Sequence, residues 1–319
     1  MQNIQTIATI GEILVEFVSH KKGCGLSEIA EFSGPYPSGA PAIFLDQAAR
    51  MGISTEMIGG VGDDGFGRIV LDRLRENQVG VNGVHVSPDH TTGVAFVSYY
   101  EDGSRDFIFH LNNTAVDAFE RPPATSDLAT TLLHVSASSL GNAAMRDKIM
   151  AMVHDVIKAG GKISCDPNAR PELMSDGAVK TAMQEVMDHS YCLMPSTSDL
   201  DFLFPDLSED AAVEQLLQAK AEIIVIKRGE HGATVLAEGE RYDFEGHKMD
   251  ELDPTGAGDC FCGTFISLVA QGVPFEEAGA RANAAGAIAV TRRGPMEGNS
   301  TPEEITAFLN QTDTQKAAQ

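Results

Sequence analysis

The sequence predicts an α/β fold with a mostly parallel central sheet, helices on both faces and a small separate β-sheet. Short apolar runs alternate with amphipathic helical stretches through most of the chain, which is the order of repeated βα units. Two further β-rich regions belong to no such unit, and they predict the small sheet. The 319 residues suffice for one large domain or two smaller ones with a buried core.

The N-terminal third begins with a strand at residues 4–10, and extended segments continue from Gly11 to Tyr36. A helix then opens at residues 38–41, because Pro41 suits a first turn where a missing N–H costs little. Gly52 ends this helix. A strand at 55–58 and a second amphipathic helix at 66–77 complete the region.

The small sheet is predicted from two β-rich runs, residues 92–100 and 106–110, joined by a loop with Asp-Gly at its tip. This hairpin and the extended segments before residue 38 would form a lid. The predicted lid comprises residues 12–37 and 91–113, and the main α/β domain comprises residues 1–11, 38–90 and 114–319.

The remaining chain alternates strand and helix and ends in residues 312–319, which are predicted to be a frayed tail. The predicted strands are 132–136, 162–165, 191–194 and 222–227, followed by a hairpin of 233–237 with 241–245. The predicted helices are 142–159, 177–187, 208–219, 257–271, 275–290 and 302–309.

The charge excludes several classes of partner. Lysine and arginine number 23 against 46 acidic residues, for a net charge of −23, so nucleic acid and anionic membranes are not expected partners. No apolar run approaches the roughly 20 residues that span a bilayer. The first residues lack the basic region of a signal peptide. A cytoplasmic protein is expected, with reduced thiols at Cys24, Cys165, Cys192, Cys260 and Cys262.

The most informative stretch is Leu252–Gly263, which reads L-D-P-T-G-A-G-D-C-F-C-G. A glycine turn that leads into a helix N-terminus directs free N–H groups and the positive end of the helix dipole at one point. An anion would bind there. Asp259 lies in the first turn of this helix, where it suits either a general base beside a phosphate or an acid that merely favours the dipole.

This stretch resembles the second signature of the PfkB (ribokinase-like) carbohydrate kinases, D-x-T-G-A-G-D-x-F. The resemblance extends from Gly11 to Pro295 and implies a ribokinase-like fold with Mg²⁺·ATP as phosphate donor. It also implies that Asp259 takes a proton from a sugar hydroxyl, while the amides of Gly256, Ala257 and Gly258 hold the transferred phosphate.

Three other motifs have counterparts in the same family. Lys227, Gly229 and Gly232 resemble its K-x-G-x-x-G nucleotide loop, and Lys227 at a strand end suits a nucleotide phosphate or ribose edge. Asn168 and Arg170 belong to a D-x-N-x-R run, where Arg170 would clamp a phosphate or sugar oxygen. Asn283 resembles an asparagine near the nucleotide. An exposed turn lysine, a structural Arg–Asp pair and a loop-bonded asparagine are the alternatives.

Three departures from the family pattern concern the sugar and the metal. The first signature puts Ile43 after Gly39 and Ala40 where an asparagine usually touches sugar hydroxyls, and Glu16 replaces an aspartate. An N-x-x-E run implied in Mg²⁺ binding reads Ser-Thr-Ser-Asp, ending at Asp199. By analogy, a monovalent cation such as K⁺ would lie near Asp253 and Thr255.

These features predict an ATP-dependent carbohydrate kinase that phosphorylates a primary hydroxyl of a small sugar. The S-G-A-P-A-I-F run resembles tagatose-kinase-like members, so a neutral ketohexose is expected, of tagatose or fructose type. A 2-keto-3-deoxygluconate-type sugar acid is the alternative if Arg105 or Arg170 offsets the Glu16 charge. The analogy also implies a homodimer formed through the lid.

Two readings from other functional classes stay open. Residues 60–65 fit the dinucleotide pattern G-x-G-x-x-G, and they would indicate an oxidoreductase. Asp63 and Asp64 argue against it, because they put negative charge where a pyrophosphate would bind. A catalytically silent sugar or nucleotide sensor would keep the fold, but it would have no need of Asp259.

Overall fold

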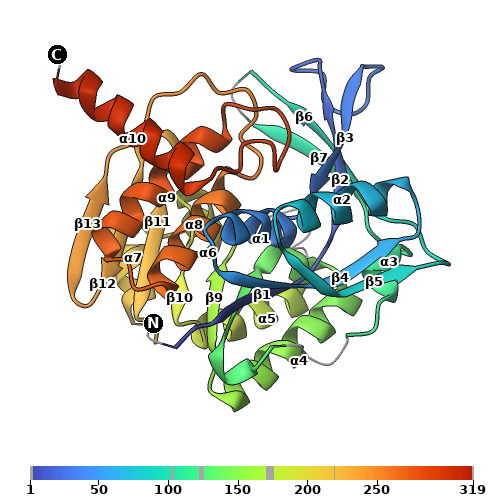
Figure 1. Cartoon of the computed structure of the whole chain (residues 1–319), viewed down its shortest axis with the longest axis horizontal. Helices are drawn as coiled ribbons and strands as arrows, with labels where there is room; N and C mark the ends of the chain where they lie inside the picture. The colour runs from blue at the N-terminus through green and yellow to red at the C-terminus, as the bar shows by residue number, and fades with distance from the viewer. Residues whose placement is uncertain (1–2, 102–103, 122–125, 170–175, 219, 318–319) are drawn as a thin grey trace.

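The computed structural model describes residues 3–101, 104–121, 126–169, 176–218 and 220–317. The strands of its main sheet are β1 (Thr6–Ile10), β4 (Ser54–Gly62), β5 (Gly80–Ser87), β8 (Thr131–Ser136), β9 (Lys162–Asp166), β10 (Cys192–Leu193), β11 (Ile223–Lys227), β12 (Ala233–Ala237) and β13 (Glu240–Phe244). Within the described residues they form one sheet in the order β13-β12-β11-β10-β9-β8-β1-β4-β5 (Figure 1). Every pair from β11 to β5 is parallel, and β12 and β13 are antiparallel, so the mostly parallel sheet is confirmed.

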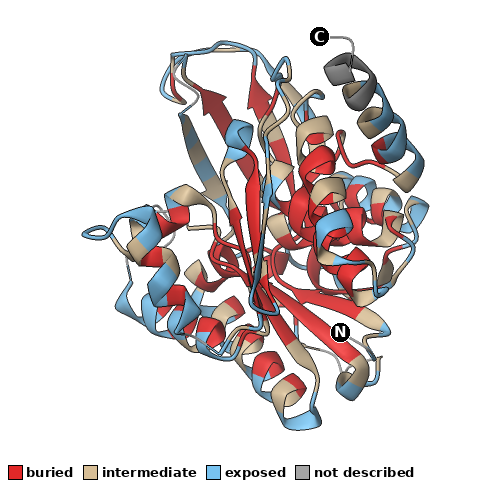
Figure 2. Cartoon of the chain, turned by 90° about the vertical axis from the view of Figure 1, so that its left-hand side faces the viewer, coloured by how far each residue is buried: buried red, intermediate tan, exposed pale blue. Residues whose placement is uncertain are grey.

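Helices cover both faces of this sheet, as predicted. One face packs on α1 (Ala40–Arg50), α2 (Gly65–Glu76), α8 (Ala257–Ala270) and α9 (Phe275–Ala289), and the other on α4 (Ala143–Ala159), α5 (Gly177–Asp188) and α7 (Glu209–Leu217). The alternation of side chains along a strand divides the core accordingly. Leu132 packs in the same cluster as Phe44, whereas the next residue, Leu133, packs in the cluster of Ile149. Figure 2 shows the central strands buried between the two layers.

The small sheet is also present. It consists, in the described part of the chain, of β2 (Leu14–Ser19), β3 (Phe32–Ser38), β6 (Gly93–Tyr99) and β7 (Arg105–His110), in the order β3-β2-β6-β7. The outer pairs are antiparallel and β2 pairs with β6 in parallel. The predicted hairpin is confirmed by the pairing of β6 with β7, although its Asp-Gly tip lies outside the described residues.

The sequence prediction missed several elements: β5, α6 (Thr197–Leu203) and the short α3 (Ala115–Ala118). β5 is an edge strand that pairs only with β4 among the described strands, and its exposed polar residues break the apolar pattern. The predicted frayed tail was wrong within the described residues, because α10 (Pro302–Ala317) continues the last helix through it.

The dinucleotide alternative was wrong as well. The carboxylate of Asp64 caps α2 by accepting from the Gly67 N–H at 2.8 Å, and it also accepts from the Thr92 N–H at 2.8 Å. A side chain on Gly62 would meet the His90 carbonyl oxygen at 2.6 Å. The helix N-terminus is therefore filled by the chain's own carboxylate and by the start of β6, where a pyrophosphate would have to lie.

Two further expectations concern the whole chain. No helix in the described ranges has the length and apolarity to cross a membrane. All five cysteines are free thiols, as predicted, and four of them are buried.

His134 makes the stability of the fold dependent on pH. Its ring stacks on Phe44 with centroids 3.8 Å apart, and burial together with the Lys227 charge lowers the pKa from 6.5 to about 3. Because the pKa of His134 is lower in the folded state than in the unfolded state, its neutral ring adds to the stability of the fold. This contribution is fully present above pH 6.5 and is lost as the pH falls toward 3.

The free energy of unfolding of the wild-type protein should therefore fall between pH 6.5 and 3. His134 should contribute up to about 1.4 kcal/mol of this fall per pH unit. Urea unfolding at several pH values should show that the free energy of unfolding of His134→Gln depends less steeply on pH. His231→Gln, at an exposed histidine, should show the same pH dependence as the wild type. Equal slopes for all three proteins would contradict the assignment.

Candidate active site

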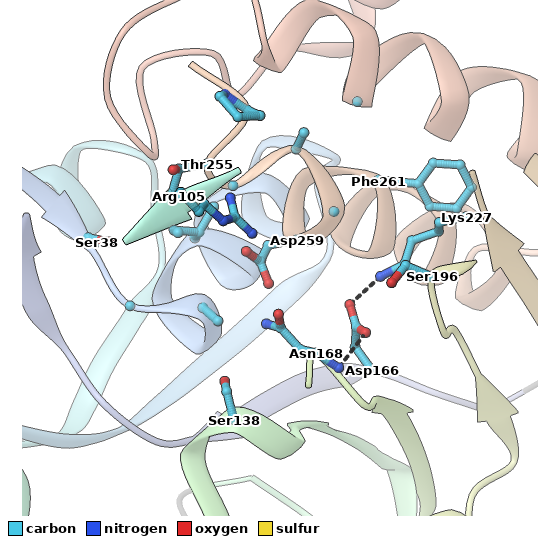
Figure 3. Close-up of a pocket in the computed structure, with 18 of the residues that line it drawn as sticks. Ser38, Arg105, Ser138, Asp166, Asn168, Ser196, Lys227, Thr255, Asp259 and Phe261 are labelled. Carbon is cyan, nitrogen blue, oxygen red and sulfur yellow. Dashed lines mark hydrogen bonds and ion pairs between the residues drawn. The ribbon is translucent and has the colours of Figure 1, made fainter. Parts of the chain in front are cut away.

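A cavity of about 1150 Å³ lies at the carboxyl ends of β9 and β11 and extends to the small sheet (Figure 3). Open parallel sheets bind ligands at this edge. The predicted site residues that line the cavity are Glu16, Gly39, Ala40, Ile43, Arg105, Asn168, Asp199, Lys227, Gly229, Gly232, Thr255, Gly256, Ala257, Gly258, Asp259 and Asn283. Of the other two, Asp253 is fully buried behind the wall, and Arg170 lies outside the described residues.

The glycine turn is built as an anion site requires. Gly256 is the N-cap of α8 in the left-handed conformation, with φ of +84°, and an added Cβ would lie 2.3 Å from the Pro295 carbonyl oxygen. Only glycine fits there. Asp259 in the first turn of α8 is 8% exposed, and Figure 3 shows its carboxylate directed into the cavity. The turn thus places the N-terminal end of α8 and a carboxylate on the wall of the cavity.

Lys227, predicted to meet a nucleotide phosphate or ribose edge, lies at the end of β11 beneath this turn. Its Nζ is 3.5 Å from the position that a Cβ on Gly258 would take, and it forms an ion pair with Asp166 (Figure 3). Burial alone would lower the pKa of Lys227, but Asp166, Cys262 and Asp199 raise it overall. The ammonium stays charged and faces the place where a bound phosphate would meet the α8 amides.

Asn168 and Asp199 hold residues 167–169, directly after β9, in place. Asn168 has φ of +39°, an uncommon conformation that asparagine tolerates, and its side chain donates to Ser136 Oγ at 3.0 Å. The Asp199 carboxylate accepts from Ala169 N at 2.7 Å and from the Ser196 N–H and hydroxyl in a capping box. These contacts give Asp199 a structural role at the cavity wall.

A Mg²⁺ that arrives with a nucleotide fits this wall. Among the described residues no group of three or more histidine, cysteine or acidic side chains forms a ready metal site. Mg²⁺ needs only one or two carboxylates when substrate phosphates and waters supply its other ligands. Asp166 and Asp199 both line the cavity and could serve this purpose, directly or through water.

The predicted nucleotide loop is glycine-dependent. Gly232 has φ of +92°, and an added Cβ would meet the Phe244 carbonyl oxygen at 1.9 Å. Asn283 donates its side-chain N–H to the Glu245 carbonyl at 2.8 Å, so it holds the loop that borders the cavity. Asn283 thus makes the hydrogen bond to a loop that was the structural alternative for this residue. The bond fixes the part of the cavity wall where the nucleotide is predicted to bind.

The opposite end of the cavity combines acids with small residues. Glu16 is buried on β2 and accepts from the Ser38 hydroxyl at 3.3 Å. Gly39, at φ of +105°, leaves no room for a side chain against the Glu12 carbonyl oxygen. Ile43 lies against Gly256, because a Cβ added to Gly256 would be 3.2 Å from the Ile43 Cγ2 atom. Ile43 therefore supports the turn as well as lining the cavity.

Several cavity residues were missed by the sequence reasoning. The inner face of β7 presents Phe107 and Phe109, which stack with centroids 5.2 Å apart, and Arg105 lies 5.3 Å from the Phe107 ring centre. Glu12 lines the cavity and accepts from the Ser139 hydroxyl at 2.5 Å. The alternation within 105–110 could have identified the two aromatic rings, because Arg105, Phe107 and Phe109 share a strand face.

Asp253 and Thr255, the predicted monovalent-cation residues, lie together behind the turn. Asp253 accepts from the Thr255 N–H at 3.0 Å and from the Gly294 N–H at 2.9 Å. Both side chains also contact the hydroxyl of Tyr99 from the small sheet. Their oxygens are of the kind that holds K⁺, but in this structure the Tyr99 hydroxyl already bonds to both.

Comparisons with known proteins identify the family of this chain. Residues 5–302 match the model of the pfkB family carbohydrate kinases. Fructokinase-1 of Oryza sativa subsp. japonica is 30% identical over 96% of this chain and 98% of its own length. A "putative Ribokinase II" from E. coli, solved in complex with ATP and Mg²⁺, is 38% identical over 97% of this chain and all of its own, with a TM-score of 0.89. A fructokinase from Vibrio cholerae O395, solved with fructose, ADP and calcium, shares the fold at 24% identity, covering 96% of this chain and 99% of its own, with a TM-score of 0.82.

The family match spans nearly the whole chain, and it includes both the glycine turn with Asp259 and the strand end with Lys227. The ribokinase-like fold that the resemblance implied is therefore confirmed. This chain belongs to the pfkB family of carbohydrate kinases.

Proposed function

We propose that this kinase transfers the γ-phosphate of ATP to a primary hydroxyl of a neutral ketohexose, of fructose or tagatose type. The observation that carries the proposal is the presence of three groups on the wall of one cavity. They are the Asp259 carboxylate, the amides of the turn at residues 256–258 and the Lys227 ammonium.

Asp259 would act as the general base. A sugar hydroxyl that enters between Glu16 and Asp259 would pass its proton to the Asp259 carboxylate as its oxygen attacks the γ-phosphorus of ATP. The bond from that phosphorus to the β–γ bridging oxygen would break, and ADP would leave with the bonding electrons. The carboxylate is 8% exposed and lies in the first turn of α8, beside the positive end of the helix dipole.

The turn and Lys227 would hold the transferred phosphate. Negative charge develops on the equatorial oxygens during transfer, and amides at a helix N-terminus stabilise it without reorganising. Mg²⁺, when bound with ATP, would neutralise part of the phosphate charge. We also propose that K⁺ binds near Asp253 and Thr255, on the side of the turn that faces away from the cavity, where it would help to hold the turn in position.

The acceptor end supports a neutral ketohexose over a sugar acid. Glu12 and Glu16 give this end negative charge, which would repel a carboxylate substrate and accept hydrogen bonds from hydroxyls. Arg105 supplies positive charge at the same end, but Phe107 and Phe109 beside it offer apolar surface to the carbon face of a ring. Because a relative of this chain is named a fructokinase, we expect fructose rather than tagatose as the substrate.

A coupled ADP-release assay across ketohexoses, pentoses, sugar acids and nucleosides tests the substrate. Fructose or tagatose should give the highest kcat/KM. A preference of more than tenfold for a sugar acid or a nucleoside would overturn the substrate assignment. An absence of sugar-dependent ADP release for every acceptor would overturn the proposed function itself.

The small sheet would serve as a lid and as a dimer contact. Its inner face lines the cavity, so closure would exclude water that could otherwise hydrolyse ATP. Its outer face carries Phe96, whose ring contacts those of Phe17 and Phe32, and Ile108 lies opposite Phe96 across β6 and β7. Phe32 is 37% exposed and Ile108 is 44% exposed. A second copy of the same face would cover them.

Replacing Ile108 with aspartate should convert a dimer into a monomer, because each copy would then bury a charge against apolar surface. Sedimentation velocity measures the change, with Leu217→Asp, at an exposed leucine on α7, as the matched control. A wild-type monomer, or a dimer that persists in Ile108→Asp, would contradict the lid contact.

A further inference from the structure

Tyr99 connects the small sheet to the glycine turn. It is the last residue of β6 and is 7% exposed, and its side chain leaves the small sheet to reach the segment before α8. Its hydroxyl donates to the Asp253 carboxylate and shares a hydrogen bond with the Thr255 hydroxyl. A residue of the small sheet therefore contacts the two residues that frame the approach to Gly256.

These two residues determine where the turn lies. The Asp253 carboxylate, fully buried, gathers the N–H groups of Thr255 and Gly294, which are at 3.0 Å and 2.9 Å. Thr255 directly precedes Gly256, whose backbone packs against the carbonyl of Pro295. Figure 3 shows Thr255 and Asp259 on the same side of the cavity. A displacement of this carboxylate would move the amides of residues 256–258.

The Tyr99 hydroxyl is bonded to two oxygens of the segment before the turn, one on the Asp253 carboxylate and one on the Thr255 hydroxyl. The neighbouring Tyr100 differs, since its hydroxyl donates to Asp106 at an exposed position away from the cavity. The two adjacent tyrosines thus have different partners on different parts of the molecule.

We propose that Tyr99 is a positioning residue for phosphoryl transfer, whose hydroxyl holds the Asp253–Thr255 segment and thereby fixes the anion-binding turn when the small sheet is in place. This inference rests on the proposed function. Tyr99 touches no reacting group. It acts through the turn, so its loss should lower the rate of transfer more than the binding of either substrate.

Steady-state kinetics of Tyr99→Phe tests the inference. We expect kcat to fall about tenfold, since the charge-assisted hydrogen bond to a buried carboxylate is lost, while the KM values for ATP and sugar stay within about twofold. Tyr100→Phe removes the same atom from the next residue and should keep its kcat within about twofold of the wild type.

A kcat for Tyr99→Phe equal to that of Tyr100→Phe would overturn the inference, as would a rise in both KM values at constant kcat. If Tyr99→Phe does not fold, Thr255→Val and Thr255→Ser test the same contact. The serine variant keeps the hydroxyl and should retain kcat, whereas the valine variant should lose it, and equal rates for the two would contradict the proposal. The wild-type protein distinguishes a failure of this inference from a failure of the proposed function. If the wild type phosphorylates no sugar, the proposed function is wrong, whereas an active wild type with an equally active Tyr99→Phe variant contradicts only the role of Tyr99.

Discussion

Replacing Asp259 with asparagine should lower kcat by about 10²–10⁴, the usual contribution of a positioned general base. The amide has the shape of the carboxylate but cannot take the proton of the sugar hydroxyl. The fold should persist, because the asparagine side chain has the same size and Gly256, not Asp259, caps α8. Affinity for ATP should change little, since the turn amides and Lys227 remain. A coupled assay for kcat and calorimetry for ATP binding measure both effects.

The alternative for Asp259, an acid that only favours the helix dipole, predicts a different result. In that case the variant would lose about 0.3–1 kcal/mol of stability and keep its turnover. Asp210→Asn is the matched control, because Asp210 also lies in the first turn of a helix, α7, but outside the cavity. Near-native turnover of Asp259→Asn would exclude the base.

The main sheet could be predicted because its strands and helices carry strong local periodicity. Leu132 and Leu133 show why: both are apolar, both are buried, and each packs on a different layer of helices. Such a run is typical of a parallel strand covered on both faces. β5 has no such run, because an edge strand leaves one side in water, and only its pairing with β4 establishes it. α6 was missed because seven residues are too few for a periodic signal.

The candidate site could be predicted where a motif is continuous in the sequence. Gly256–Asp259 and Lys227–Gly232 each combine a strand end or helix start with glycines, and their local geometry follows from that order. Tyr99 carries no comparable signal, because its partners lie more than 150 residues away in the chain. The place of Lys227 under Gly258 also depends on how β11 and α8 pack, which no local pattern encodes.

The Lys227→Met variant should lose both activity and stability, for separable reasons. Loss of a cation that faces the transferred phosphate should lower kcat by about 10²–10³, the effect of removing one anion-stabilising group. Loss of the partner of Asp166, which is 2% exposed, leaves a buried charge and should cost about 3–5 kcal/mol. Urea unfolding and the ADP-release assay measure the two losses.

The double variant Asp166→Asn/Lys227→Met separates the two effects. Without the carboxylate there is no orphaned charge, so most of the lost stability should return. The missing ammonium cannot be replaced by an amide, so kcat should stay low. The single variant Asp166→Asn keeps the cation and should retain more activity than the double variant. Recovery of kcat together with stability in the double variant would mean that Lys227 only balances Asp166. A kcat well below that of Asp166→Asn in a fully stable double variant would instead indicate that the lysine acts on the phosphate, because the single variant already includes any effect of Asp166 on Mg²⁺.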